Sequence, residues 1–223
     1  MINKKKEIVI FGVAEMSELA HFYFENDSEY KVVAFTVDQE FKQSDSFKDL
    51  PLVAFEDVEK LYPPEEFGMF ISLGYSKINQ IRKQKYEIAK SKGYELVSYI
   101  SSKATILSKD IGDNAFILED NTIQPFTKIG NNVVLWSGNH IGHHSVIKDH
   151  CFFASHIVVS GGVTIGECCF LGVNATLRDH ITIGENCVLG AGCLILGDVE
   201  ANGLYIGSKT PRSEIESQKL KKI

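Results

Sequence analysis

Several features are missing from the 223-residue sequence, and each absence excludes a class of protein. No apolar run approaches the roughly 18 residues that a membrane-spanning helix needs, and the charged start at residues 1–6 leads into an apolar strand rather than a signal-peptide core. The formal net charge of -6 argues against nucleic acids and anionic membranes as partners. We therefore expect a cytoplasmic protein with no membrane insertion and no nucleic-acid binding.

Cysteine is also sparse, with five residues and no CxxC pair. Four of the five share one position of the repeat described below, where a thiol acts as a small apolar filler: Cys151, Cys169, Cys187 and Cys193. We therefore expect neither a catalytic nor a metal-binding cysteine.

The sequence does contain a six-residue repeat. From Ile111 onward, every sixth residue is large and apolar for fifteen consecutive positions. These positions are Ile111, Ile117, Ile123, Ile129, Leu135, Ile141, Ile147, Phe153, Val159, Ile165, Leu171, Leu177, Ile183, Leu189 and Ile195. Helices need apolar spacings of three and four, and half-buried strands need strict alternation, so neither ordinary period fits.

Two further positions of the repeat are restricted. The side chain four residues after each apolar position is usually small or β-branched, and glycine follows the apolar residue directly in seven units. These glycines are Gly112, Gly130, Gly142, Gly166, Gly172, Gly184 and Gly190. The pattern fits a short strand with a large and a small inward side chain, followed by a turn in which glycine eases the corner. Three units close a coil of 18 residues, which predicts five stacked coils of a parallel β-helix over 111–200.

The first hundred residues alternate between strand and helix patterns. Short apolar runs predict strands over 7–12, 30–35, 67–73 and 94–100, whereas helical spacing appears over 14–26 and 78–92. This alternation predicts a small doubly wound, Rossmann-like parallel sheet.

The chain thus divides into an α/β domain over 1–102, a β-helical domain over 103–212 and a basic tail over 213–223. Ligands of an open parallel sheet bind at the carboxyl ends of its strands, which here are near Gly12, Val13, Ala14 and Asp38. Phosphate at the start of the following helix is the physical expectation, although the carboxylate of Glu15 opposes it.

With both parts together, the whole chain resembles the NeuD/PglD family of sugar acyltransferases, most strongly over 111–212. The resemblance implies a left-handed β-helix, an exception to the usual right-handed crossover. It also implies a homotrimer that moves acetyl from acetyl-CoA to a sugar, often to the amino group of a nucleotide-linked amino sugar.

The resemblance also assigns roles to particular residues. The family's catalytic histidine follows an inward apolar position by two residues, which is the place of His143 after Ile141, and the residue after it, usually acidic in the family, is His144. Gly161, one coil later, matches the glycine whose backbone amide faces the thioester carbonyl, so it also contacts CoA. The segment 206–212 resembles the family's closing Gly-x-Pro-x-Arg motif.

The remaining CoA contacts implied are Ala191, Lys209 and Arg212. The stretch 209–222 carries five cations against two glutamates, a local surplus that suits phosphates: Lys209, Arg212, Lys219, Lys221 and Lys222. The family's first-strand loop is usually richer in glycine and carries a histidine, whereas this chain has Gly12 followed by Val13 and Ala14.

Six of the seven histidines fall between residues 140 and 180. A neutral imidazole can accept the proton of an incoming amine or hydroxyl, so His143 predicts direct transfer without an acyl-enzyme. His140 and His156 are candidates for contact with substrate or CoA, with His140 assigned to the sugar. His150 and His180 follow an inward position by three residues and are predicted to face solvent without a chemical role.

Three alternatives stay open. One is O-acetylation of a sugar hydroxyl, and another is a non-catalytic trimeric binding or scaffold protein. The third is a β-helical carbonic anhydrase, because His144 and His180 are two coils apart, but no two histidines differ by five residues and two stacked ligands make a poor zinc site. We expect no metal.

Overall fold

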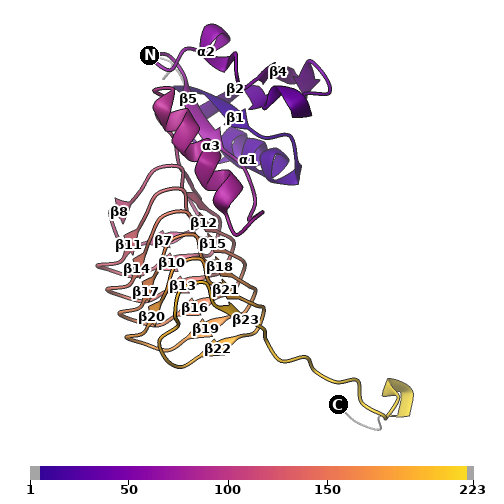
Figure 1. The fold of residues 1–223 in the computed structure, drawn as a ribbon, viewed down its shortest axis with the longest axis vertical. Coiled ribbons are helices and arrows are strands. Elements are labelled where there is room, and N and C mark those ends of the chain that lie inside the picture. The colour runs from indigo at the N-terminus through magenta and orange to yellow at the C-terminus, as the bar shows by residue number, and fades with distance from the viewer. Residues whose placement is uncertain (1–5, 220–223) are drawn as a thin grey trace.

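A computed structural model describes residues 6–219 and shows two parts joined end to end (Figure 1). An α/β domain forms one end of the molecule and a column of short strands forms the other, with the carboxyl-terminal segment extending away from the far end of the column (Figure 1). None of the helices in this described part of the chain is long and apolar enough to cross a membrane.

The α/β domain is built on a five-stranded sheet in the order β3-β4-β2-β1-β5. Its strands are β1 (Lys6–Phe11), β2 (Tyr30–Val37), β3 (Ser46–Phe47), β4 (Leu50–Ala54) and β5 (Gly68–Ile71). Its helical segments are α1 (Glu15–Asn26), η1 (Gln39–Phe41), α2 (Val58–Leu61) and α3 (Gln80–Ser91). Strands β1, β2, β4 and β5 pair in parallel, which confirms the strands predicted near 7–12, 30–35 and 67–73.

Alternate residues of β1 fill two separate cores. Ile8 and Ile10 pack in a cluster with Phe24 of α1, whereas Val9 belongs to a second cluster with Tyr86 of α3. Since successive side chains of a strand point to opposite faces, the two helices cover opposite faces of the sheet. This is the doubly wound arrangement that the sequence predicts.

One hairpin has no counterpart in the sequence prediction. Strands β3 and β4 pair antiparallel across Lys48 and Asp49, whose φ angles of 51° and 61° are those of a type I′ turn. Such turns favour Asn-Gly or Asp-Gly, so a Lys-Asp pair gives no turn signal.

The predicted strand over 94–100 is instead divided between the two parts. Leu96 bridges to Met69 of the α/β sheet, whereas Tyr99 and Ile100 pair with Phe116 and Ile117 in the column. The column therefore begins at Tyr99, four residues before the boundary expected from the repeat.

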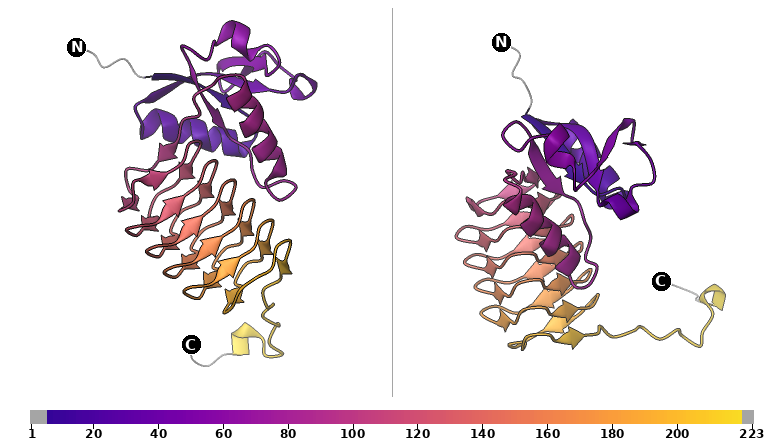
Figure 2. Two further views of the ribbon diagram at one scale, coloured as in Figure 1. Left: turned by 60° about the vertical axis from the view of Figure 1, so that its left-hand side comes forward. Right: turned by 45° about the horizontal axis from the view of Figure 1, so that its top comes forward.

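The column has three flat faces, each a parallel sheet in which successive coils contribute one strand each (Figure 2). Face 1 consists of β6 (Tyr99–Ile100), β9 (Phe116–Ile117), β12 (Val134–Leu135), β15 (Phe152–Phe153), β18 (Phe170–Leu171), β21 (Val188–Leu189) and β23 (Leu204–Tyr205). Face 2 consists of β7 (Thr105–Ile106), β10 (Thr122–Ile123), β13 (His140–Ile141), β16 (Val158–Val159), β19 (Thr176–Leu177) and β22 (Leu194–Ile195). Face 3 consists of β8 (Asp110–Ile111), β11 (Lys128–Ile129), β14 (Val146–Ile147), β17 (Thr164–Ile165) and β20 (Thr182–Ile183).

Residues 18 apart pair from coil to coil, as Ile123 does with Ile141 and Ile141 with Val159. The large apolar residues of the repeat point inward and form one continuous core. The four cysteines at the small position are buried in that core, as predicted. The fold is the expected left-handed parallel β-helix of hexapeptide repeats.

Most turns of the column contain a residue in the left-handed backbone conformation, three positions after an inward apolar residue. Corner A joins faces 1 and 2, corner B joins faces 2 and 3, and corner C joins faces 3 and 1. The non-glycine corner residues are Asn114, Asp120, Phe126, Asn132, His144, His150, His156, Cys168, Asn174, His180 and Asn186, with φ between 50° and 65°. Asparagine, aspartate and histidine are the residues besides glycine that enter this region most often, which explains much of this composition.

The glycines that directly follow inward residues have a different role from the predicted one. Gly142 has no positive φ, but a Cβ there would lie 2.6 Å from the backbone nitrogen of Gly161 in the next coil. A Cβ on Gly130 would likewise lie 2.7 Å from the nitrogen of Asp149. These glycines allow neighbouring coils to approach closely, and the turn itself is made two residues later.

Helix α3 joins the α/β domain to corner C. Arg82 is fully buried, and its guanidinium donates to the carbonyl of Asn132, to that of His150 at 2.9 Å and to Oδ1 of Asn79 at 2.8 Å. Nδ2 of Asn79 in turn donates to the carbonyl of Cys168 at 3.0 Å. Three successive coils are thus hydrogen-bonded to one helix.

The prediction that His150 faces solvent is wrong. His150 is only 5% exposed, because α3 covers corner C and Tyr86 packs against its ring. Burial, followed by the positive charge of Arg82, lowers the pKa of His150 to about 4. The repeat locates a corner but carries no information about which corner the other domain covers. His180, at corner B, is 74% exposed, as predicted.

Candidate active site

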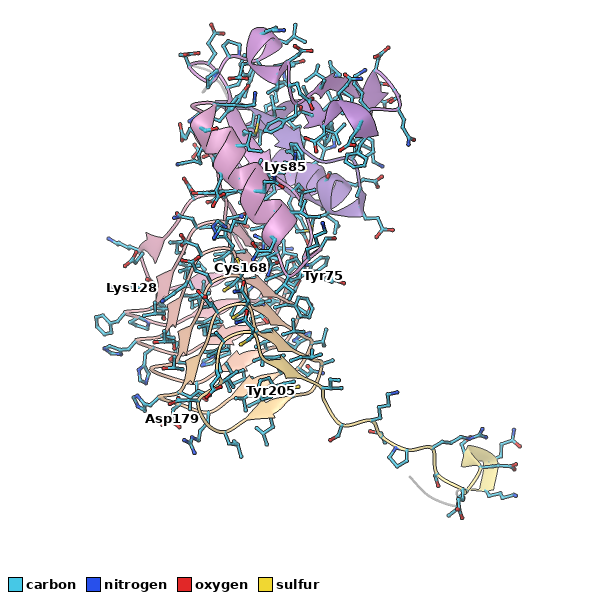
Figure 3. The ribbon with its side chains drawn as sticks, viewed as in Figure 1. Tyr75, Lys85, Lys128, Cys168, Asp179 and Tyr205 are labelled. Atoms are coloured by element: carbon cyan, nitrogen blue, oxygen red, sulfur yellow. The ribbon has the colours of Figure 1, made fainter. Side chains whose placement is uncertain are left out.

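His143 lies on corner B, just after β13 of face 2. Its side chain is exposed, and its backbone N–H donates to Oε1 of Gln124 in the preceding coil at 2.9 Å. Figure 3 shows Lys128 and Asp179 on the side of the column where corner B lies. A base at this position is open to a ligand that approaches from outside the column.

The neighbouring residue His144 contacts His143 through ring nitrogens. The two Nδ1 atoms are 3.1 Å apart, and the two rings are nearly perpendicular, at 85°. His144 has a φ of 59°, and its ring packs on Phe126 with a centroid separation of 4.7 Å. The left-handed turn at His144 therefore directs its imidazole back toward His143 and Phe126 rather than into the next coil.

Gly161 lies against the His143 imidazole, one coil further on. A Cβ at Gly161 would be 2.7 Å from Cε1 of His143 and 2.8 Å from Nε2, so a side chain there would displace the ring from this position. Among the residues that the structure describes, the N–H of Gly161 has no hydrogen-bond acceptor. The site therefore combines a base candidate with an unpaired backbone donor, the two groups that acyl transfer from a thioester requires.

The other predicted histidines occupy different places. His140 lies in β13 on face 2, partly buried and adjacent to the inward Ile141. His156 is at corner A, across face 2 from His143, and its ring lies over Gly138. One copy of the chain therefore does not bring His140, His143 and His156 together at one point.

The candidate CoA contacts are also separated from His143 within one chain. Ala191, near corner A, lines a groove of about 380 Å³ on face 1. The other residues that line the groove include Tyr75, Trp136, Phe152, Phe170 and Val173. Lys209 and Arg212 are exposed on the extended segment that follows β23, whereas Lys221 and Lys222 lie outside the described residues.

Three of the predicted acceptor contacts line one cavity at the carboxyl ends of β1 and β2. The cavity is about 470 Å³ in volume, and its lining contains Gly12, Val13 and Ala14. The rest of the lining is Val37, Phe41, Gln43, Ser44, Phe47, Leu52 and Leu73, with no charged side chain among these described residues. Gly12 has a φ of 125°, and a Cβ there would be 2.9 Å from the carbonyl oxygen of Ser72, so the loop requires glycine.

The carboxylate of Asp38 forms an ion pair with Lys85. Its Oδ1 is 2.6 Å from Nζ of Lys85 on α3, and both side chains are only 16% exposed. The sequence indicated the strand end correctly but not the cation that reaches it from a helix 47 residues later. In residues 6–219 there is also no group of three or more metal-ligating side chains.

Part of the repeat matches a known sequence family. Residues 109–143 and 162–197 match the family described as bacterial transferase hexapeptide, six repeats. A comparison with curated proteins finds no match.

Solved structures resemble the chain over nearly its whole length. PerB from Caulobacter crescentus, in complex with CoA and GDP-perosamine, is 22% identical, with a TM-score of 0.78 over 90% of this chain and 94% of that one. The acetyltransferase domain of PglB from Neisseria gonorrhoeae is 22% identical, with a TM-score of 0.81 over 91% and 97% of the two chains. WeeI from Acinetobacter baumannii is 17% identical, with a TM-score of 0.76 over 90% and 97%.

These comparisons confirm the expected fold in both of its parts. The chain is a two-part hexapeptide-repeat protein, with a Rossmann-like domain followed by a left-handed β-helix. It shares this architecture with PerB and with the PglB acetyltransferase domain.

Proposed function

We propose that the chain is a cytoplasmic acetyl-CoA-dependent N-acetyltransferase that acts on the amino group of a nucleotide-linked amino sugar. The observation that carries this proposal is the packing of the exposed His143 imidazole against Gly161, whose N–H has no acceptor among the described residues. The likeness to an acetyltransferase domain crystallised with acetyl coenzyme A supports the donor, and the likeness to PerB supports the acceptor class.

In this mechanism the amine nitrogen of the sugar attacks the thioester carbonyl carbon, and one of its protons passes to Nε2 of His143. The N–H of Gly161 donates to the oxyanion that forms. The C–S bond then breaks, CoA leaves as a thiolate, and the thiolate takes up the proton from the His143 imidazolium. A new amide and a CoA thiol result, and both residues return to their starting states.

The proposed enzyme is a homotrimer assembled through face 2. Four side chains along that face are large, apolar and exposed: Leu107 at 58%, Val158 at 40%, Leu194 at 63% and Leu196 at 55%. When three copies turn this face toward a common axis, corner B of each copy meets corner A of the next. Ala191 and the groove beside it then lie near His143 of a neighbouring copy, which gives CoA a site built from two chains.

The uncharged cavity at Gly12 is the proposed site for the nucleotide end of the acceptor. Its aromatic and small polar lining, which includes Phe47 and Gln43, suits a base and ribose better than a diphosphate. Asp38, which follows the lining residue Val37, is held in place by Lys85 and accepts hydrogen bonds at the edge of this site in our proposal.

The test is a CoA-release assay with acetyl-CoA and a panel of UDP-, dTDP- and GDP-linked amino sugars, compared with the same sugars bearing a hydroxyl in place of the amine. We expect turnover with an amino sugar and a His143→Ala enzyme that is roughly 10²- to 10⁴-fold slower, with CoA binding retained by calorimetry. His143→Ala turnover at a third of wild type would move the base to His140 or His156. A product cleaved by neutral hydroxylamine would be an ester, and would establish O-acetylation instead.

A further inference from the structure

The partner of His143 is a second imidazole rather than a carboxylate. Within residues 6–219, the acceptor within hydrogen-bond reach of Nδ1 of His143 is Nδ1 of His144, at 3.1 Å. A hydrogen bond between two imidazole nitrogens holds one proton, so in the neutral pair one ring donates and the other accepts. In one arrangement Nε2 of His143 can accept a proton, and in the other it cannot.

If His143 donates, its Nδ1 carries the hydrogen and its Nε2 has a free lone pair. If His144 donates, Nε2 of His143 carries the hydrogen and the ring cannot accept a proton there. Since Cε1 and Nε2 are the His143 atoms nearest to where a Cβ on Gly161 would lie, the first arrangement leaves the lone pair on a nitrogen beside Gly161, where the thioester would bind in our proposal. Gln124 does not compete, because its Oε1 accepts from the backbone N–H of His143.

We propose that His144 is a positioning residue that accepts the Nδ1–H of His143, holds it in the base-competent tautomer and shares the proton that His143 takes up. This inference rests on the proposed acyltransferase function. His144 is exposed, so the shared positive charge reaches solvent through its ring. The base is thereby oriented without a fixed negative charge.

No carboxylate forms an ion pair with either ring in the described chain. The preceding coil presents Gln124, Pro125 and Phe126 along corner B, and the following coil presents two glycines. Lys128 lies at the start of face 3, and the one histidine ion pair of this corner is that of Asp179 with His180, two coils from His144. A carboxylate at position 144 would stabilise the protonated form of His143, whereas a neutral imidazole does so only through the hydrogen bond.

The backbone at His144 allows closely matched variants. Its φ of 59° suits glycine and asparagine without strain, so neither replacement disturbs the corner. His144→Gly removes the acceptor, His144→Asn replaces it by a neutral oxygen at a similar reach, and His144→Asp replaces it by a charged one. Phe126→Leu tests separately whether packing on the His144 ring matters.

We expect His144→Gly to lower kcat by about 10- to 100-fold with acetyl-CoA affinity unchanged, and His144→Asn to recover most of that loss. His144→Asp should move the acidic limb of the kcat/KM profile to higher pH by roughly one unit, because the carboxylate keeps His143 protonated. Wild-type turnover in His144→Gly, or superimposable profiles for the aspartate variant and wild type, would overturn the proposal.

A spectroscopic measurement separates this inference from the proposed function. Long-range ¹⁵N–¹H correlation spectra of histidine-labelled protein report the tautomer of each ring without any substrate. We expect Nδ1–H for His143 in wild type and a mixture of tautomers in His144→Gly. If the protein shows the expected tautomer but transfers no acetyl group, the proposed function is refuted and the inference about the His143–His144 pair stands. An active enzyme with Nε2–H on His143 would sink the pair alone.

Discussion

Replacing His150 by asparagine should remove an acid-sensitive element from the fold. His150 is buried under α3, where burial and the charge of Arg82 lower its pKa to about 4. In the unfolded chain the same group titrates near 6.5. The folded protein therefore binds fewer protons than the unfolded chain between these two values, and acid favours unfolding.

The sign and size of the effect follow from this difference. The stabilisation is fully present above pH 6.5, where both states are neutral at this site, and it is lost progressively as the pH falls toward 4. A shift of this size corresponds to about 3 kcal/mol in total and about 2 kcal/mol at pH 5.

Asparagine is a suitable replacement because the same column of corner C already contains it. Nδ2 of Asn114 donates to Oδ1 of Asn132 at 2.8 Å, and Nδ2 of Asn132 lies 2.9 Å from Nδ1 of His150. An asparagine at position 150 continues this ladder with its own Oδ1 as acceptor. Its backbone conformation, with a φ of 64°, is one that asparagine adopts readily.

The assay is urea unfolding of wild type and His150→Asn at pH 7.5 and pH 5.0. Other titrating groups cancel in the comparison, so the variant should lose about 2 kcal/mol less stability on acidification than wild type. His180→Asn is the matched control, since His180 has the same corner conformation but is 74% exposed. This variant should lose as much stability between pH 7.5 and pH 5.0 as wild type does. Equal losses in His150→Asn and wild type would refute the reasoning.

Three further predictions concern catalysis, the domain junction and assembly. Gly161→Ala should displace the His143 ring and lower turnover roughly 100-fold in the CoA-release assay. Gly197→Ala is the control and should not lower turnover, because a Cβ at that position meets nothing within 4 Å. Equal turnover in the two variants would contradict the packing argument. Arg82→Met should lower the free energy of unfolding in urea by about 3 kcal/mol or more, because it leaves buried carbonyls without a donor. A loss below about 1 kcal/mol would count against a role of Arg82 in joining the two parts of the chain. Sedimentation equilibrium should give a mass of three times 24.9 kDa for wild type and a smaller mass for Leu194→Asp, which places a charge on face 2. A wild-type mass of 24.9 kDa at micromolar concentration would exclude the trimer.

The β-helix was predictable because its six-residue period is set by the spacing of inward residues along the sequence, and not by contacts with another domain. A residue such as Ile141 must point inward in every coil, and a small residue such as Ala175 must fill the space beside it, so the sequence records both. In each case local spacing and burial follow one rule repeated along the chain.

What the sequence could not supply were contacts between distant segments. The burial of His150 depends on where α3 docks, and the pairing of Asp38 depends on Lys85 of that same helix. The β3–β4 hairpin was missed because Lys48 and Asp49 enter the left-handed region without the usual glycine. These features are set by tertiary packing, which no short window of sequence contains.

Two causes account for five of the six histidines between residues 140 and 180. Four of the six occupy left-handed corners, where histidine is one of the residues that the backbone tolerates: His144, His150, His156 and His180. His143 also lies at corner B, but it is not the residue with the positive φ, so its backbone conformation does not favour histidine. Its ring lies over a glycine in the next coil that leaves room for it and whose N–H is unpaired among the described residues. In our proposal the functional signal in this repeat is therefore a histidine one residue before the left-handed corner residue, with a glycine 18 residues later, and not the number of histidines.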